Sequence, residues 1–218
     1  MVETLNESSL HATLKEMFCK NNSKTEAKLE NYICDILCDD GKIIEIQTSN
    51  FSNMKKKLSF LIKNHVVEIV YPISINSYIK MLNADGQIRS FNKSPKHGNI
   101  FQTCKEISAI KDLINEHNLK LKILYIESIT TKIDDKKGRS RYKNPRIIDK
   151  SLINIINEEN YSCIKEFILH LLNILPNPFT TKDIESYGYK RYPSYVIWFF
   201  KNLNLIYEDG KKGNRKIY

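Results

Sequence analysis

The sequence lacks the segments that mark membrane and secreted proteins. None of its apolar runs approaches the roughly 18–20 residues that a membrane-spanning helix requires. The N-terminal sequence MVETLNESSLHATLK has neither the positively charged start nor the apolar centre of a signal peptide. We therefore expect a cytoplasmic protein with no membrane partner.

Cysteine is scarce and scattered, at positions 19, 34, 38, 104 and 163. The two nearest, Cys34 and Cys38, are four residues apart within an expected strand, which is not a zinc-ligand spacing. The sequence also has no P-loop, no Rossmann glycine pattern, and no HExxH or GxSxG motif. These absences argue against a disulfide scaffold, a zinc site and the commonest nucleotide-binding and serine-hydrolase sites.

What the chain has in excess is positive charge. Lys and Arg number 34 against 25 Asp and Glu, which gives a formal net charge of +9. Such a surplus favours a polyanionic partner, with nucleic acid as the first candidate. A genome biased towards Lys, Ile and Asn would give the same surplus without that function. The 218 residues, 41% of them hydrophobic, are enough for one large domain or for a core with a small appendage.

Residues 29–48, LENYICDILCDDGKIIEIQT, predict two short strands joined by a tight turn. Successive side chains of a strand point to opposite faces of the sheet. Glu45 and Gln47 therefore share one face, and Ile44 and Ile46 lie behind them.

The turn decides whether Asp35 joins Glu45. A two-residue loop at residues 40–41 separates the two acids, because it pairs Ile36 with Glu45. A three-residue loop at residues 39–41, with Gly41 in the left-handed conformation, places Asp35 opposite Glu45. Glycine in the third position favours the second alternative, in which two carboxylates and a carboxamide meet on one face.

Two adjacent carboxylates repel each other unless a cation lies between them. Carboxylate oxygens are ligands that suit Mg²⁺, and a bound divalent ion activates water and neutralises charge on a phosphate. The alternative is that Asp35 and Glu45 are solvated side chains on the open face of an antiparallel sheet. Both acids lie inside strongly apolar strands, where acids are uncommon, and on this ground the metal site and the solvated alternative stand level.

The other apolar patterns predict an α/β arrangement. Helices are expected at residues 5–20, 51–64 and 99–117, and strands at residues 25–29, 32–38, 42–48, 65–75 and 119–130, with a hairpin at 77–91. Pro72 predicts that pairing stops within its strand or that the strand becomes an edge there.

Charged residues recur every four positions along the first helix, as Glu7, His11 and Lys15. They form either a solvated stripe or a row from which Glu7 or His11 reaches the two acids. The loop at residues 92–98 is basic, and its Lys93 and Lys96 are candidate phosphate contacts; an ordinary polar loop is the alternative.

Residues 132–150 change in character, with eight Lys or Arg, three Asp and no periodicity. We expect a basic linker or arm in which Arg139, Arg141 and Arg146 contact the backbone of a nucleic acid. The alternative is a plain solvated linker.

Residues 151–218 predict a separate small domain, with helices at 162–175, 180–187 and 193–203 and a hairpin at 205–218. This order resembles a winged helix-turn-helix, in which the third helix reads the major groove and the wing touches the DNA backbone. Winged helices also mediate protein contacts. The expected DNA contacts are Lys190, Arg191, Tyr192, Lys211, Lys212 and Arg215.

The order of helix, three strands, helix and strand, with Asp35 before the turn and Glu45-Ile46-Gln47 after it, resembles the PD-(D/E)xK nuclease superfamily. The run from Glu7 to His11 with Lys15, then EIQT and SPKHG, is similar to a bacterial subgroup in which the first helix offers an extra acid. The resemblance covers roughly residues 4–130. Gln47 departs from it, because the superfamily usually has lysine there and only some restriction enzymes have glutamine.

The resemblance implies a restriction-endonuclease-like αβββαβ core with a mixed sheet at residues 1–131, followed by a linker at 132–150 and the winged-helix-like domain at 151–218. It implies a Mg²⁺-dependent DNA endonuclease of restriction, repair or junction-resolving type, with Mn²⁺ able to substitute. The metal ligands would be Asp35, Glu45 and the backbone carbonyl of Ile46, with Glu7 as the extra acid. Gln47 would orient a water molecule, and the missing lysine charge would come from the metal or from a neighbour such as Lys15 or Lys55.

Two other functions stay open. One is a non-catalytic DNA-binding regulator built on a decayed nuclease fold, which Gln47 favours and the presence of both acids opposes. The other is a nuclease that acts on RNA, although the winged-helix pattern favours double-stranded DNA. Cleavage of both strands would favour a homodimer.

Overall fold

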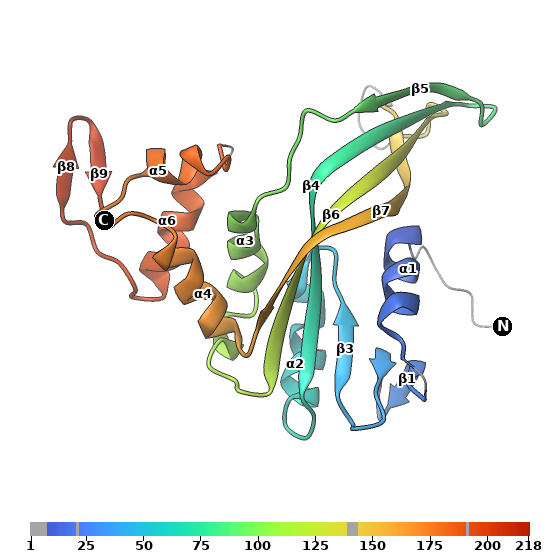
Figure 1. Ribbon diagram of the computed structural model, residues 1–218, viewed down its shortest axis with the longest axis horizontal. Coiled ribbons are helices and arrows are strands. Elements are labelled where there is room, and N and C mark those ends of the chain that lie inside the picture. The colour runs from blue at the N-terminus through green and yellow to red at the C-terminus, as the bar shows by residue number, and fades with distance from the viewer. Residues whose placement is uncertain (1–7, 21, 139–143, 191) are drawn as a thin grey trace. The chain divides into compact units, whose positions relative to one another are not determined.

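The computed structural model describes residues 8–20, 22–138, 144–190 and 192–218 (Figure 1). Its first elements are α1 (Ser9–Phe18), β1 (Lys24–Leu29), β2 (Tyr32–Leu37), β3 (Ile43–Ile46), η1 (Phe51–Met54), α2 (Lys55–Leu61), β4 (Val67–Asn83) and β5 (Ile88–Lys93). Then come η2 (Ile100–Gln102), α3 (Thr103–Ser108), η3 (Lys111–Leu113), β6 (Leu119–Asp134) and β7 (Arg146–Tyr161). The last are α4 (Ile164–Asn173), α5 (Thr181–Ser186), α6 (Pro193–Asn202), β8 (Gly210–Lys212) and β9 (Arg215–Ile217).

The fold is mixed α/β, as expected. One mixed sheet has the strand order β1-β2-β3-β4-β6-β7, with β5 paired to β4 beside this path, and β8 pairs with β9 separately. The β1–β2 and β2–β3 pairs are antiparallel, so the expected opening of helix, strand, strand, strand is confirmed. The chain divides into two compact units, which are described separately. Unit 1 comprises residues 1–48, 70–98 and 123–159, and unit 2 comprises residues 49–69, 99–122 and 160–218.

Helix α1 packs on the sheet of unit 1 through its apolar face. Leu10 and Leu14 are fully buried against Ile36, Ile44 and Ile46, in a core that also includes residues of β4 and β6. In Figure 1, α1 runs beside β3. The i, i+4 spacing of the two leucines supplies the buried face, and Ile44 and Ile46 lie behind Glu45 as predicted.

The start of α1 is fixed by two polar residues. The Ser8 hydroxyl caps the helix by accepting from the backbone N–H of His11, and the carboxylate of Asp149 accepts from Ser9 N at 2.8 Å and Ser9 Oγ at 2.7 Å. The first N–H groups of a helix lack partners within it, and an anion at this end is favourable. A side chain of β7 thereby holds the first turn of α1 in place.

Strand β4 continues through Pro72 instead of stopping there. Before the proline, Val70 accepts from the backbone N–H of Gln47 at 3.0 Å; after it, β5 pairs with β4 from Tyr78 to Leu82. Proline has no N–H to donate to a ladder. Pro72 therefore lies between the part of β4 that is bonded to Gln47 and the part that pairs with β5.

The expected linker at residues 132–150 is corrected at both ends. Strand β6 runs to Asp134, β7 begins at Arg146, and the two are neighbours in the sheet. The expected boundary at residue 150 lies inside β7, so the domains predicted from the sequence do not coincide with the two units. Strand β7 lies at the edge of the sheet, and an edge strand tolerates charged residues. These charges hide the isoleucine pattern of β7 in the sequence, which therefore predicts a linker.

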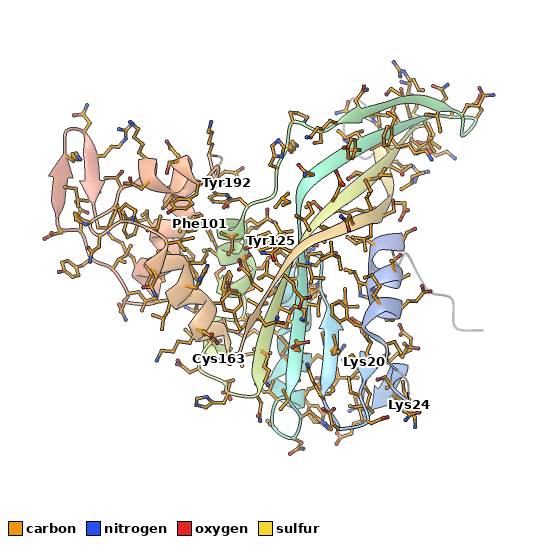
Figure 2. The ribbon with its side chains drawn as sticks, viewed as in Figure 1. Lys20, Lys24, Phe101, Tyr125, Cys163 and Tyr192 are labelled. Atoms are coloured by element: carbon orange, nitrogen blue, oxygen red, sulfur yellow. The ribbon has the colours of Figure 1, made fainter. Side chains whose placement is uncertain are left out.

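Unit 2 combines helices from the middle and the end of the chain. Its fully buried aromatic side chains include Phe51, Phe101, Phe167, Phe199 and Phe200. The ring of Phe101 (Figure 2) meets Tyr187 edge to face, with centroids 6.0 Å apart. The helix expected at residues 99–117 is interrupted, because Ile110 and Leu113 donate to carbonyls three residues back, as in a 3₁₀ helix.

Helices α4, α5 and α6 and the hairpin β8–β9 lie near the positions predicted for the winged-helix-like segment. The predicted third helix does not present all of its surface to solvent. Tyr195 of α6 forms a hydrogen bond between its hydroxyl and Ser108 Oγ of α3 at 2.7 Å, within unit 2. This contact removes part of the α6 surface from any role in a DNA groove.

Candidate metal and nucleic-acid sites

The strand register points Asp35 towards Glu45. Ile36 pairs with Ile44 and Leu37 with Ile43, and counting one residue further in each strand sets Asp35 opposite Glu45. The turn between the strands spans residues 38–42, with Gly41 at φ 79°. The three-residue loop is thus confirmed, and its physical cause is the left-handed glycine at the third position.

Asp35 is held between the neighbouring strand and the first helix. Its Oδ2 accepts from the backbone N–H of Ile46 at 2.8 Å, and His11 Nε2 lies 3.3 Å from the same oxygen. The Asp35 side chain is 18% exposed, and that of His11 is 21% exposed. The carboxylate is therefore fixed in direction but still accessible to solvent. His11 reaches this acid, as one of the two sequence alternatives anticipated.

Glu45 is among the most buried acids of the chain. It is 4% exposed and lies in β3, where all four residues are buried. A carboxylate at this depth needs hydrogen bonds or a cation to offset its lost hydration. Gln47 lies two residues after Glu45, just past the end of β3, and its backbone N–H donates to the carbonyl of Val70.

Lys15 lies one helical turn after His11 and is also buried, with 8% of its surface exposed. Its ammonium forms an ion pair with Glu26 of β1. This stretch of α1 is thus not a solvated stripe. Glu7, the first residue of the row, lies outside the described residues. Lys55, the other lysine that the sequence offers for the missing charge, pairs with Asp112 within unit 2 and lowers the pKa of that carboxyl.

Within the described residues, no group of three or more His, Cys, Asp and Glu side chains is arranged to hold a metal ion. The predicted set has only two such side chains, Asp35 and Glu45, and adds the backbone carbonyl of Ile46. Carboxylate and carbonyl oxygens are the donors that Mg²⁺ prefers, so the chemistry of this set fits that ion.

The predicted nucleic-acid contacts of unit 1 differ in their surroundings. Lys93 and Lys96 are exposed, at the end of β5 and in the loop after it. Arg146 is bound to Asp135 through Nε at 3.0 Å and Nη2 at 2.7 Å, and this contact lowers the pKa of the Asp135 carboxyl. Arg139 and Arg141 lie outside the described part of the chain.

The predicted contacts of unit 2 lie on its surface. Lys190, Tyr192 and Lys211 are exposed, whereas Arg191 is not among the described residues. Lys212 and Arg215 of the β8–β9 hairpin line a pocket of about 380 Å³ together with Lys182 of α5, Thr180, Asp183 and Ser186. Lys182 was not singled out from the sequence; its position just after the capped start of α5 was the available signal.

Two half-buried polar groups of unit 1 also escaped the sequence analysis. Burial lowers the pKa of Lys150 on β7 below its ordinary 10.5. Tyr125 on β6 (Figure 2) donates its hydroxyl to Glu159 at 3.1 Å, and burial and this carboxylate raise its pKa. The isoleucines and leucines near these two residues were the only feature of the sequence that pointed to their burial.

The chain matches the family described as "Domain of unknown function (DUF8091)" over residues 8–162. It belongs to that family. An "Uncharacterized protein" from Treponema pallidum (strain Nichols) is 38% identical over 217 residues, which are 100% of this chain and 86% of that protein. No solved structure matches the chain.

The DUF8091 match extends from the cap of α1 to just past β7 and includes Asp35 and Glu45. Helices α4–α6 and the hairpin β8–β9 follow it, although the similarity to the Treponema protein covers them. No helix among the described residues is long and apolar enough to cross a membrane.

Proposed function

We propose that this DUF8091 protein is a metal-dependent phosphodiesterase that cleaves DNA, with Asp35 and Glu45 at its active site. The observation that carries the proposal is the register of β2 and β3, which places the two acids opposite each other. Asp35 is oriented by Ile46 and His11, and Glu45 is almost fully buried.

The order of elements supports the same proposal. Helix α1, strands β1–β3, helix α2 and strand β4 follow the αβββαβ order of the PD-(D/E)xK resemblance. Asp35 lies on the second strand and Glu45 on the third, as that resemblance requires. The finer assignments, a restriction-endonuclease-like core and a winged helix formed by α4–α6 and β8–β9, are part of the proposal.

Asp35, Glu45 and the carbonyl of Ile46 would hold Mg²⁺ or Mn²⁺. When bound, the ion lowers the pKa of a coordinated water and neutralises charge on the scissile phosphate. The Ile46 N–H keeps the Asp35 carboxylate in one orientation, and preorganisation of this kind lowers the reorganisation needed during reaction. Gln47 can accept or donate a hydrogen bond but carries no charge. Lys15 is the buried cation on the helix that also presents His11.

The test is cleavage of supercoiled plasmid with Mg²⁺ or Mn²⁺, beside an EDTA control. Asp35→Asn and Glu45→Gln remove one charge each and keep the side-chain shape. Asp39→Asn is the matched control, because Asp39 is an exposed acid in the turn of the same hairpin. Metal-dependent cutting that both active-site variants lose and the control keeps supports the proposal. Equal cutting by wild type, Asp35→Asn and Glu45→Gln contradicts it.

The second candidate is a DNA-binding regulator without catalysis. It is favoured by Gln47 and by the three basic side chains around the Thr180 pocket, which suit a phosphate backbone. A gel shift of the same plasmid without cutting in either metal would support it. A parallel assay on structured RNA tests whether the substrate is RNA.

A further inference from the structure

A pair of aromatic rings is stacked on the ribbon formed by β4 and β5 in unit 1. The rings of Tyr78 and Phe91 lie nearly parallel, at 3°, with their centroids 5.4 Å apart. Phe91 is nevertheless 52% exposed, and Ile88 at the far end of the ribbon is 62% exposed. These exposed side chains leave apolar area in contact with water.

The register shows which side chains share this face. Tyr78 pairs with Lys93, Lys80 with Phe91 and Leu82 with Ile88, and cross-strand partners point to the same side of an antiparallel ribbon. A bulge between Met81 and Leu82 keeps Ile88 on that side. The face, here called the ribbon face, therefore alternates aromatic rings and ammonium groups and comprises Tyr78, Lys80, Leu82, Ile88, Phe91 and Lys93.

The segment that forms the ribbon carries more positive than negative charge. Residues 70–98 contain four Lys or Arg and a single acid, Asp85, which lies in the turn. Arg89, inside the bulge, reaches Asp134 of β6 at 3.4 Å. The face thus offers flat apolar surface for stacking and cations for an anionic ligand, which are the two elements of single-strand recognition.

The base of the ribbon is firmly tied. Ser94 N donates to Ser77 O at 2.8 Å, Gly98 N donates to Ser74 O at 2.7 Å, and His97 Nδ1 lies 2.7 Å from Ile75 O. These bonds hold the loop after β5 along β4, so that Lys93 and Phe91 enter the ribbon in a fixed register. A preordered face loses little conformational freedom when it binds.

We propose that the ribbon face binds single-stranded nucleic acid, with bases stacked on Phe91 and Tyr78 and phosphates near Lys80 and Lys93. Duplex bases are already stacked on one another and would not present their faces to the rings, whereas unpaired bases would. The inference deepens the proposed function, on which it rests for the identity of the ligand, by assigning unpaired strands or junctions as the preferred substrate.

A second copy of the chain fits this face less well. Two-fold pairing of identical ribbon faces would bring Lys80 and Lys93 against the lysines of the partner, and like charges in contact are unfavourable. A polyanion with aromatic bases satisfies both the rings and the cations.

The experiment measures fluorescence anisotropy of labelled oligo(dT) and of a labelled hairpin duplex, in EDTA. The Asp35→Asn protein is used throughout, so that binding is measured without cleavage. Adding Phe91→Leu is expected to weaken oligo(dT) binding by about ten-fold, the loss of one stacked base, and to leave duplex binding unchanged. Adding Phe91→Tyr retains the ring and should retain binding. Adding Ile153→Ala, which alters a comparably exposed apolar residue on β7, is the control.

Lys80→Gln with Lys93→Gln is expected to weaken oligo(dT) binding and to reduce its salt dependence, since two phosphate contacts are removed. Oligo(dT) affinity unchanged in Phe91→Leu, or lost equally for oligo(dT) and duplex, overturns the inference. So does a change of sedimentation from dimer to monomer in that variant, which would assign the face to a second copy. Plasmid cleavage by the wild-type protein is a separate readout, so failure of either proposal is recognised independently.

Discussion

The Asp35 carboxylate accepts the backbone N–H of Ile46 on the neighbouring strand, at 2.8 Å. The bond lies where the register sets Asp35 opposite Glu45, so this acid both joins two strands and belongs to the proposed active site. Suitable variants separate the two roles.

Asp35→Ala should destabilise the protein by about 1–3 kcal/mol, because it leaves the N–H of Ile46 without its acceptor. Asp35→Asn keeps an oxygen acceptor and should cost less, while still removing the charge that the proposed activity needs. Urea unfolding compares the two with wild type. Equal stability of wild type and Asp35→Ala would show that the bond contributes nothing to the fold.

Gly98→Ala tests the close approach of the loop to β4. A Cβ at Gly98 would lie 2.7 Å from Ser74 O and 2.8 Å from Ile73 Cγ2, so the backbone must move. We expect a loss of about 1–3 kcal/mol in the free energy of unfolding. Gly86→Ala is the comparison, because Gly86 has φ +86° and open space around it, so only backbone strain applies. A Gly98→Ala protein as stable as wild type would contradict the observed packing.

Removing charge from the Thr180 pocket should weaken DNA binding in a salt-dependent way. Lys212→Gln and Arg215→Gln are each expected to reduce the slope of log affinity against log salt by roughly one. Lys216→Gln is the matched control on the same hairpin, because Lys216 is paired with Glu208 at 2.8 Å. Titrations at several salt concentrations give the slopes. Equal slopes for all three variants and wild type would assign DNA binding to another surface.

The lowered pKa of the Lys150 ammonium makes the free energy of unfolding depend on pH. Burial lowers its pKa in the folded state below 10.5, so between the lowered value and 10.5 the unfolded chain binds more protons than the folded one. Stability contributed by this group therefore rises with pH across that window. Lys150→Met should be more stable than wild type at neutral pH, and the difference should shrink towards pH 10.5. Urea midpoints across this range measure it, and a constant difference would contradict the mechanism.

The hairpin of residues 29–48 could be predicted because local chemistry specifies it. Gly41 selects the loop, the loop selects the register, and the alternating isoleucines select the buried face. Similarly, the four-residue spacing of His11 and Lys15 could be recognised in the sequence. Only the fold shows that His11 lies next to Asp35.

Strand β7 could not be predicted in the same way. Its isoleucines at 147, 148, 153 and 156 are exposed by more than two fifths, so burial does not impose the clean alternation of a half-buried strand. Pairing with β6 is a long-range interaction that no local pattern encodes. Unit 2 likewise joins segments separated by many residues in the chain, an association that no local pattern encodes.

Pro72 has a consequence for how the family can vary. Because β4 is bonded to Gln47 before the proline and to β5 only from Tyr78 onward, the ribbon can lengthen or shorten at the Asn83–Gln87 turn without shifting the strands that carry Asp35 and Glu45. Insertions in pairs of residues would keep the same side chains on the same side. The length of the ribbon is therefore a property that evolution can adjust separately from the proposed active site.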